Sequence, residues 1–436
     1  MTPSSASAAA AVSDAAPVPA PSPWLARRLF PLLATIILVA IGMMMTTWLG
    51  PALDGKSAWA LPHDLWGTLI AAQRLLHGDL SGLYTQPTGL VAFPGAAAIL
   101  VPVVALIDAV GFSLQTQSLA NPYPSAWPLA GPYEIVISSV ALFAADAIAE
   151  RLGVSRPKRA LLAAAEAAAL ASVSVRWGHP EDAVAVGLLL YGVLALSRSR
   201  AGWSAWLIGA AVAVQPLVLL ALPVVLAVVA PRRLAGFLAR AAAPGVLLLG
   251  AAALANWTAT FKAVTSQPNY PAVDHLTPWT SLAPRLSNGA VAAGPARVLA
   301  IVAACGCGLA VWYRWRATPR AAGWSPSALR EVLWWVAVTM AIRTVFEPVM
   351  VSYYLWPSLA VALIPATRNW SRLVAASITA TVVTGVSQGW WRSPWTWWLP
   401  MIAGLGLTLF FARVPLRRDA DPGGGPAASP PQQAPA

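Results

Sequence analysis

Acidic and histidine side chains, the groups best suited to move protons, gather in a few polar segments of this chain. These groups are His63, His77, His179, His275, Asp54, Asp64, Asp79, Glu181, Asp182, Asp274 and Glu347. A carboxylate or an imidazole in such a segment can accept the proton of a hydroxyl group. Any loop needs polar residues, so each of these residues alone has a structural explanation. Their shared bias toward the same segments favours a functional site.

Asp64 is the first candidate for a base. It opens a segment in which apolar residues recur at helical spacing, namely Leu65, Leu69, Ala72, Leu75 and Leu76. The pattern predicts an amphipathic helix that could lie at a membrane surface, with Asp64 at its N-terminal end. There the carboxylate could deprotonate a hydroxyl group, or it could only stabilise the helix dipole by under about 1 kcal/mol.

Arg343 is the basic residue whose position most needs an explanation. It lies within an otherwise apolar segment and precedes Phe346-Glu347-Pro348. A charged side chain inside a membrane helix is costly, and its presence is by default a sign of function. The alternative is a structural ion pair with Glu347, four residues further on.

The segments that position these side chains must lie in a membrane. Of the 436 residues 58% are hydrophobic and only 10% are charged, a composition that excludes a soluble globular domain. Apolar runs at about 29–49, 234–255, 298–313 and 395–411 each approach the ~20 residues that a helix needs to cross a ~30 Å hydrocarbon core. The runs do not alternate with period 2, which argues against a barrel and predicts an all-α, polytopic protein.

The net charge of +12 reflects topology and does not point to a nucleic-acid partner. By our count 20 of the 28 basic residues lie in seven clusters at the ends of apolar runs, within 27–28, 151–159, 198–200, 232–240, 314–330, 368–372 and 413–418. The remaining 8, Arg343 among them, are left for the other side of the membrane. This asymmetry places the clusters and both chain ends in the cytoplasm, and it places the acidic and histidine groups outside.

The spacing of the clusters predicts roughly 11 to 13 spans over residues 29–415, with large outer loops at about 50–90 and 256–293. Residues 203–230 should form a hairpin of two short helices that turns at Gln215-Pro216. Between residues 91 and 150 the number of crossings must be odd, so either one apolar segment is re-entrant or residues 113–131 hide a weak span. We expect the tails, residues 1–28 and 416–436, to be disordered and cytoplasmic. Cys305 and Cys307 lie in an apolar run, and we expect neither a metal site nor a cofactor.

One pattern resembles a family. An acidic residue after the first apolar run is followed by two small residues, a Leu-x-Gly-x-x-Leu-Tyr-like stretch and an aromatic-Pro pair that opens the next apolar segment. In this chain the elements are Asp64, Ala71-Ala72, Leu75-Leu76-His77-Gly78, Leu83-Tyr84 and Phe93-Pro94-Gly95. The pattern is similar to that of GT-C membrane glycosyltransferases, above all the actinobacterial polyprenyl-phosphate-mannose-dependent α-(1→2)-mannosyltransferases. It covers about residues 29–230, and Phe93-Pro94-Gly95 departs from the family's more usual Tyr-Pro-Pro.

The resemblance implies a reaction and a set of roles. A base, Asp64 with His63 or Glu181 in reserve, would deprotonate the acceptor hydroxyl. Arg343 or Arg176 would hold the phosphate of a polyprenyl-phosphate sugar donor. Other groups would line the substrate site, namely His179, Asp182, Glu347, Tyr353, Tyr354, His275 and Trp279.

The expected activity is therefore inverting transfer of a sugar, with mannose favoured over arabinofuranose. The acceptor would be a hydroxyl of a glycolipid or polysaccharide outside the plasma membrane, and membrane lipid would surround the enzyme. A transporter or flippase of lipid-linked sugars is the rival from another class, since it too needs many helices. Such a protein would place ionisable groups near the bilayer midplane, where Asp108, Asp146 and Glu166 are the candidates. A non-catalytic assembly subunit is a third possibility.

Overall fold

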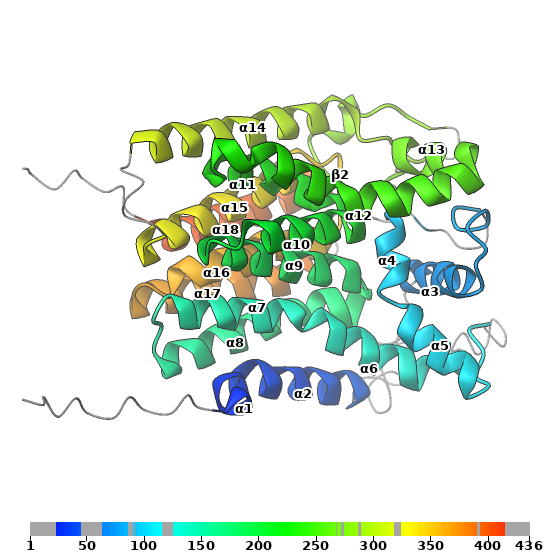
Figure 1. Ribbon diagram of the computed structural model, residues 1–436, viewed down its shortest axis with the longest axis horizontal. Coiled ribbons are helices and arrows are strands. Elements are labelled where there is room, and N and C mark those ends of the chain that lie inside the picture. The colour runs from blue at the N-terminus through cyan, green and yellow to red at the C-terminus, as the bar shows by residue number, and fades with distance from the viewer. Residues whose placement is uncertain are drawn as a thin grey trace, which may run out of the picture.

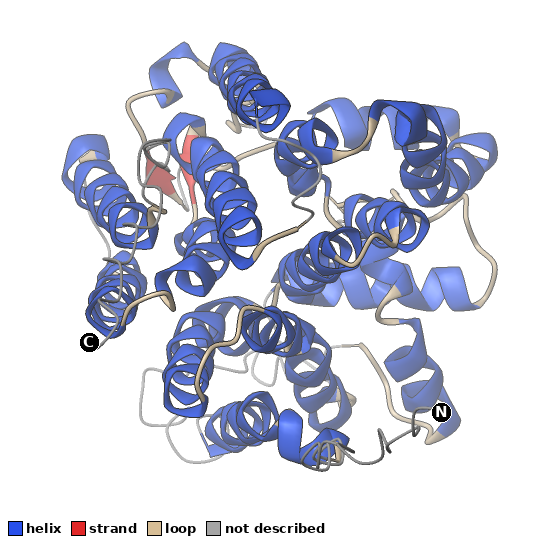
Figure 2. Ribbon diagram, turned by 60° about the vertical axis from the view of Figure 1, so that its left-hand side comes forward, coloured by secondary structure: helices blue, strands red, loops and turns tan. Residues whose placement is uncertain are grey.

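The computed structural model describes residues 23–44, 63–85, 90, 92–115, 125–266, 268–271, 274–286, 289–317, 324–389 and 393–414. In this part of the chain most helices run along one long axis (Figure 1). Two short strands, β1 (His275–Leu276) and β2 (Val349–Met350), pair antiparallel and lie among the helices (Figure 2). The expectation of an all-α protein is confirmed.

The elements fall into long rods and short connecting pieces. The rods are α2 (Leu29–Met44), α6 (Trp127–Ser138) followed by α7 (Val140–Arg151), α8 (Arg156–Ala171) followed by the π-helical turn η2 (Ser172–Trp177), α9 (Pro180–Ser197), α10 (Ala201–Val214), η3 (Pro216–Ala221) followed by α11 (Leu222–Val228), α12 (Leu234–Ala255), α14 (Gly294–Ala317), α15 (Pro326–Phe346), α16 (Trp356–Ala366), α17 (Trp370–Ser387) and α18 (Pro394–Ala412). The short pieces are α1 (Trp24–Arg27), α3 (His63–Leu76), α4 (Pro94–Ala98), α5 (Val101–Ala109), η4 (Pro231–Arg233), α13 (Trp257–Ser266), η5 (Thr280–Leu282) and η7 (Ser352–Leu355).

Six of the described helical stretches are long and apolar enough to cross a membrane. They are Trp127–Arg151, Arg156–Trp177, Pro180–Ser197, Pro231–Ala255, Gly294–Arg316 and Pro394–Ala412. Some of them present apolar side chains on the outside of the bundle; on α12, Val246, Leu247 and Leu254 are exposed. An apolar surface of this kind suits contact with lipid. The length and composition of these helices are those of a membrane protein, and the larger count of 11 to 13 spans stays a prediction.

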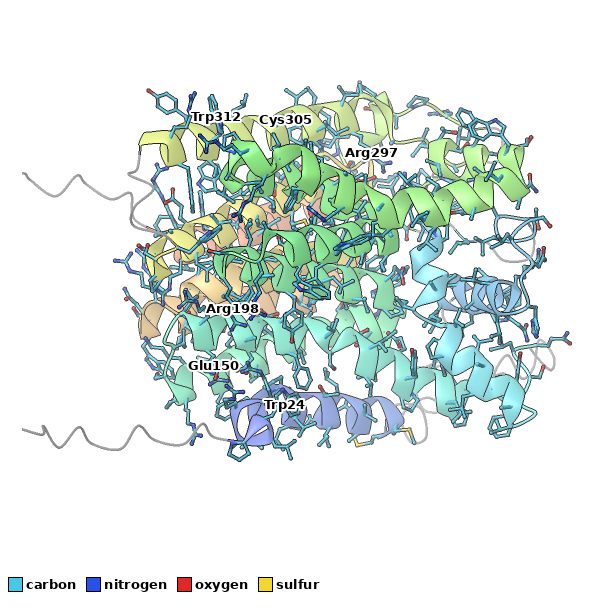
Figure 3. All side chains as sticks on the ribbon, viewed as in Figure 1. Trp24, Glu150, Arg198, Arg297, Cys305 and Trp312 are labelled. Atoms are coloured by element: carbon cyan, nitrogen blue, oxygen red, sulfur yellow. The ribbon has the colours of Figure 1, made fainter. Side chains whose placement is uncertain are left out.

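The basic clusters meet at one end of the bundle, which we call the arginine-rich end. Three basic residues join segments far apart in the sequence: Arg28 contacts Asp146 and Glu150, Lys158 contacts the Arg368 carbonyl, and Arg330 contacts the Leu152 carbonyl. Two more contacts join neighbouring helices, Arg159 with Asp146 and Arg314 with Glu331. Figure 3 shows Trp24, Glu150, Arg198 and Trp312 toward this end. At the opposite end lie α3, α4, α5 and α13, and we call it the loop-rich end (Figure 1).

The structure resolves which segment near residues 91–150 runs the length of the bundle. The α5 helix has nine residues, which at 1.5 Å each span ~14 Å, less than half of a ~30 Å hydrocarbon core. Both α4 and α5 lie at the loop-rich end beside α3, whereas α6 and α7 together form one long rod (Figure 1). Of the two apolar segments, the one at 133–149 lies in a helical stretch long and apolar enough to cross a membrane, whereas the one at 91–112 forms only short helices.

The predicted turn at Gln215-Pro216 is confirmed. Pro216 lacks a backbone N–H, and its ring disfavours helical geometry at the preceding residue. Gln215 is extended, with φ −145° and ψ 113°, between the end of α10 and the start of η3. The chain thus changes direction close to the loop-rich end.

The predicted amphipathic helix is confirmed as α3, and part of its apolar face is covered by protein. Leu65 and Leu69 are each 1% exposed because α3 packs against α4 and α5. Protein therefore covers the Leu65 and Leu69 part of this face, while Leu76 stays 36% exposed, and the position of α3 at a membrane surface stays a prediction. The small residues Ala71 and Ala72 are fully buried. Periodicity reveals an apolar face but not whether lipid or protein covers it.

Candidate functional site

The candidate site begins where α8 ends. Its last residues form the π-helical turn η2, a feature that is frequent at functional sites. Gly178 then adopts left-handed geometry, with φ 65°, which glycine reaches without the steric cost of a side chain. This turn allows α9 to start at Pro180, and it puts Glu181 and Asp182 in the first helical turn, where the helix dipole favours negative charge.

His179 and Glu181 form a buried pair. The Nδ1 atom of His179 lies 2.6 Å from Oε1 of Glu181, and both side chains are less than a tenth exposed. The imidazole stacks on the ring of Tyr353 at 4.0 Å between centroids, and Tyr353 in turn contacts Trp177. A carboxylate on one ring nitrogen fixes the orientation of the imidazole and decides which nitrogen carries the proton.

Asp182 is held by the turn between α10 and η3. The side-chain amide of Gln215 donates a 2.7 Å hydrogen bond to Oδ1 of Asp182. Because Pro216 forces Gln215 out of helical geometry, the amide is available at the end of α10 to reach across to α9. The hairpin turn predicted from sequence therefore carries a residue of the site.

Arg343 completes the cluster from the last turn of α15. Its Nε lies 3.3 Å from Oε2 of Glu347, and its guanidinium lies over the ring of Tyr354, 4.1 Å from the centroid. It is also within electrostatic range of Asp182. Neither Nη group makes a hydrogen bond to the described residues.

Glu347 has a second basic partner, Arg297, whose Nη2 lies 2.9 Å from Oε1. The carboxylate of Glu347 is 3% exposed and is therefore clamped between two guanidinium groups. The ion pair that sequence analysis offered as the structural role of Arg343 is present. Because Arg297 also pairs with Glu347, Glu347 would keep a basic partner if Arg343 bound a ligand.

The loop before α14 braces this corner. The Thr277 hydroxyl donates to the Glu347 carbonyl at 2.8 Å, and the Trp279 indole N–H donates to the Val345 carbonyl at 2.7 Å. His275 pairs with Met350 between β1 and β2, and its ring is stacked on Trp397. Burial lowers the pKa of His275 to about 4, so the imidazole is neutral near pH 7. Both His275 and Trp279 are used in packing the loop against α15 and α18.

The remaining predicted residues lie further out. Arg176 is exposed, and it makes no hydrogen bond or ion pair with residues that the structure describes. His63 and Asp64 begin α3, but their side chains lie outside the described part. The α3 helix is linked to the site through α4: α3 packs on α4, and α4 packs on the end of α10. At Gly95 a side chain would come within 2.3 Å of the Ala213 carbonyl oxygen, two residues before Gln215.

Glu134 belongs to this cluster, and sequence analysis missed it. It lies on α6, is 1% exposed, and is within electrostatic range of Glu181 and His179. Neither of its carboxyl oxygens has a hydrogen-bond partner in the part of the chain that the structure describes. The available signal was a glutamate inside an apolar run. The partnership of Gln215 with Asp182 was missed as well, because nothing local in the sequence indicates it.

The site thus brings together the guanidinium of Arg343, several carboxyl groups, the imidazole of His179, and the phenol rings of Tyr353 and Tyr354. Such a set can hold an anionic group and accept a proton. Among the described residues there is no group of three or more histidine, cysteine or acidic side chains placed to hold a metal ion. No protein-family model and no curated protein matches the chain.

Proposed function

We propose that this chain is a polytopic membrane glycosyltransferase of the GT-C type, which transfers a sugar from a polyprenyl phosphate to a hydroxyl of a glycolipid or polysaccharide. Mannose is the favoured sugar and arabinofuranose the alternative. The proposal rests on the resemblance around Asp64 and on the cluster of Arg343 with His179, Glu181 and Asp182. The plasma membrane would hold the enzyme with the loop-rich end facing outward.

The observation that carries the proposal is the hydrogen bonding of the Arg343 guanidinium. A buried or half-buried arginine usually uses its donors on protein partners, whereas this one leaves both Nη groups without a hydrogen bond to the described residues. A guanidinium with two parallel donors matches the oxygens of a phosphate. The ring of Tyr354 lies against this guanidinium, and Tyr353 stacks on His179 beside it, so aromatic packing holds the cluster in place.

The proposed step is one displacement with inversion at the anomeric carbon. The acceptor oxygen forms a bond to that carbon while the bond to the phosphate oxygen of the donor breaks. The acceptor proton passes to the carboxylate of Asp64, and polyprenyl phosphate leaves with the electron pair. Arg343 would stabilise the negative charge that grows on the phosphate as it leaves.

The experiment that tests the function measures sugar transfer directly. Membranes from cells that express the chain, and matched membranes without it, are incubated with radiolabelled polyprenyl-phosphate mannose or polyprenyl-phosphate arabinofuranose. We expect label to enter an envelope glycolipid or polysaccharide only where the chain is present. Transfer from neither donor above the control would contradict the proposal, and transfer from arabinofuranose alone would change the sugar.

The orientation gives a separate prediction. The split of basic residues predicts that reporter fusions at Ser155, Ala201 and Ala420 report the cytoplasm, and that fusions at Gly82 and Asn269 report the outside. Alkaline phosphatase and green fluorescent protein serve as paired reporters, because each is active on one side only. An outside signal at Ala201 would reverse the orientation and place the candidate site in the cytoplasm.

A transporter or flippase of lipid-linked sugars is the second candidate, and Glu166 is the observation in its favour. This glutamate is 2% exposed, about 15 Å along α8 from its start, and its Oε1 has no hydrogen-bond partner among the described residues. The other two acids expected near the midplane have local partners. Asp146 is bound by Arg159 and Arg28 at the arginine-rich end, and Asp108 accepts from Gln73 on α3. Glu166 and Glu134 are therefore the two buried acidic residues that remain as candidates for a role in transport.

A further inference from the structure

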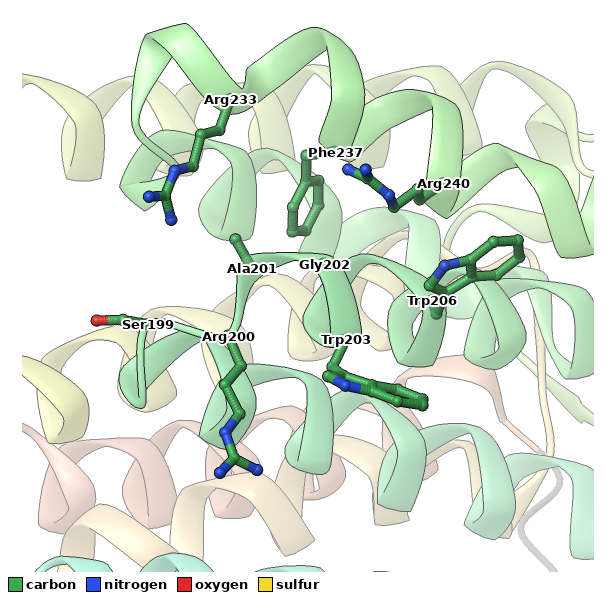
Figure 4. A pocket seen from close by; sticks show the side chains of 9 residues that line it. All are labelled: Ser199, Arg200, Ala201, Gly202, Trp203, Trp206, Arg233, Phe237 and Arg240. Carbon is green, nitrogen blue, oxygen red and sulfur yellow. The ribbon is translucent and has the colours of Figure 1, made fainter.

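A cavity of about 760 Å³ lies at the arginine-rich end, between α10 and α12. Figure 4 shows that Arg200, Arg233 and Arg240 surround it together with Trp203, Trp206 and Phe237. The candidate site lies at the start of α9 and the end of α10, whereas this cavity lies at the start of α10. Most of the length of the two helices therefore separates the cavity from the site (Figure 1). Its lining is therefore independent of the chemistry proposed above.

The cavity arises from the way two helices diverge. At Gly209 a side chain would come within 2.4 Å of the Ala241 carbonyl oxygen, so α10 and α12 are in backbone contact at that level. Toward the arginine-rich end the helices separate, and Phe237, 1% exposed, fills the space between them. The cavity lies next to the Phe237 ring and is flanked by the guanidinium groups of Arg200, Arg233 and Arg240.

The three arginines have no acidic partner in the part of the chain that the structure describes. Among the described residues, the only side-chain hydrogen bond that the three arginines donate runs from Nη1 of Arg240 to the Gly236 carbonyl of its own helix. A second cavity at the same end, lined by Arg314, Glu331 and Trp334 among others, differs in this respect, because Glu331 neutralises Arg314 at 2.8 Å. All three arginines are exposed, and an anion between them would be attracted by three positive charges at once. The uncapped N-terminus of α10, which opens into the same cavity at Ala201, adds to the preference for an anion.

We propose that this cavity binds the phosphate of an anionic phospholipid headgroup. A phosphate matches guanidinium donors, and basic pockets between membrane helices are suited to acidic headgroups. The surroundings indicate a lipid and not a soluble phosphate, since Trp203 and Trp206 are 68% and 44% exposed beside the arginines. Exposed indole rings next to basic groups are typical of the membrane interface. From the cavity α12 continues with the exposed Val246 and Leu247, along which acyl chains can lie.

The test uses the purified full-length protein in detergent, after removal of bound lipid. Native mass spectrometry measures the binding of phosphatidylglycerol and of phosphatidylcholine with the same acyl chains. We expect phosphatidylglycerol to bind several times more tightly. Arg240→Gln should weaken it about fivefold, and the triple variant Arg200→Ala/Arg233→Ala/Arg240→Ala should weaken it by more, at about fivefold per arginine.

The matched control is Arg232→Ala, which removes the same charge from the residue next to Arg233 but does not line the cavity. We expect its binding to stay close to that of the unmodified chain. Thermal unfolding of each variant shows that it is folded, and the single Arg240→Gln variant serves if the triple variant is not. Equal binding of the two lipids, or equal loss in the control, would overturn the proposal. Displacement of phosphatidylglycerol by inorganic phosphate at comparable concentration would also overturn it, in favour of a soluble phosphate compound.

Discussion

Replacement of Asp64 by asparagine is expected to lower sugar transfer by roughly 10² to 10⁴-fold while the protein accumulates normally in the membrane. Asparagine keeps the size of the side chain and its ability to cap a helix, so α3 should form as before. What it loses is the negative charge that a general base needs. If Asp64 only stabilises the dipole of α3, the loss is under about 1 kcal/mol of stability, and transfer is nearly unchanged. The two explanations therefore differ by orders of magnitude in one assay.

Asp79→Asn is the matched control for this experiment. Asp79 lies just beyond the end of α3, and its Oδ1 accepts hydrogen bonds from the Ser81 hydroxyl and the Gly82 N–H, both at 2.9 Å. These bonds, that of Ser81 first, lower the pKa of the carboxylate, which already has a structural role in the turn. We expect transfer by Asp79→Asn to remain near that of the unmodified enzyme. Normal transfer by Asp64→Asn would move the base to His63 or Glu181, and indifference at all three would favour the transporter or subunit.

Replacement of Arg343 by glutamine is expected to lower transfer by about 10² to 10³-fold, the effect of losing one positioned group that stabilises charge on a leaving oxygen. The loss should fall on the rate at saturating donor as well as on donor binding, because the negative charge on the phosphate increases as the bond to the sugar breaks. Arg343→Lys should recover only part of the activity. Lysine keeps the charge but lacks the planar fork that donates to two phosphate oxygens and stacks on Tyr354.

Arg297→Gln separates a role in binding phosphate from a role in holding Glu347. Both arginines contact the Glu347 carboxylate, and the contact from Arg297 is the shorter, at 2.9 Å against 3.3 Å. If Arg343 acts only through Glu347, the two glutamine variants should lose similar activity. If Arg343 holds the donor phosphate, Arg343→Gln should lose much more at similar protein levels. A steady-state comparison of the two variants with varied donor concentration distinguishes these outcomes.

The parts of this architecture that could be predicted from the sequence depend on short-range physics. Long apolar stretches with basic ends predicted helices suited to a membrane, and six described helical stretches have that length and composition. The turn at Gln215-Pro216 followed from the geometry of proline alone, and α3 followed from the spacing of its apolar residues. Each of these features depends on one continuous segment of the chain.

Tertiary structure decided which faces and charges meet. The apolar face of α3 packs against α4 and α5, and the nine-residue α5 lies at one end of the bundle. Asp146 looked like a possible carrier of protons until folding placed it against Arg159, 13 residues later, and Arg28, 118 residues earlier. A charge in an apolar helix has the same sequence signature whether its partner is a distant arginine or a substrate.

The candidate site shows the same division. The sequence by itself determined that acidic, histidine and arginine groups interrupt apolar segments, because their cost in a membrane makes them conspicuous. Only tertiary structure decided that Gln215 reaches Asp182, that Arg297 shares Glu347 with Arg343, and that Glu134 lies beside His179 and Glu181. These contacts join residues up to about fifty positions apart through the packing of whole helices. Their geometry depends on helix rotation and tilt, which local residue patterns do not specify.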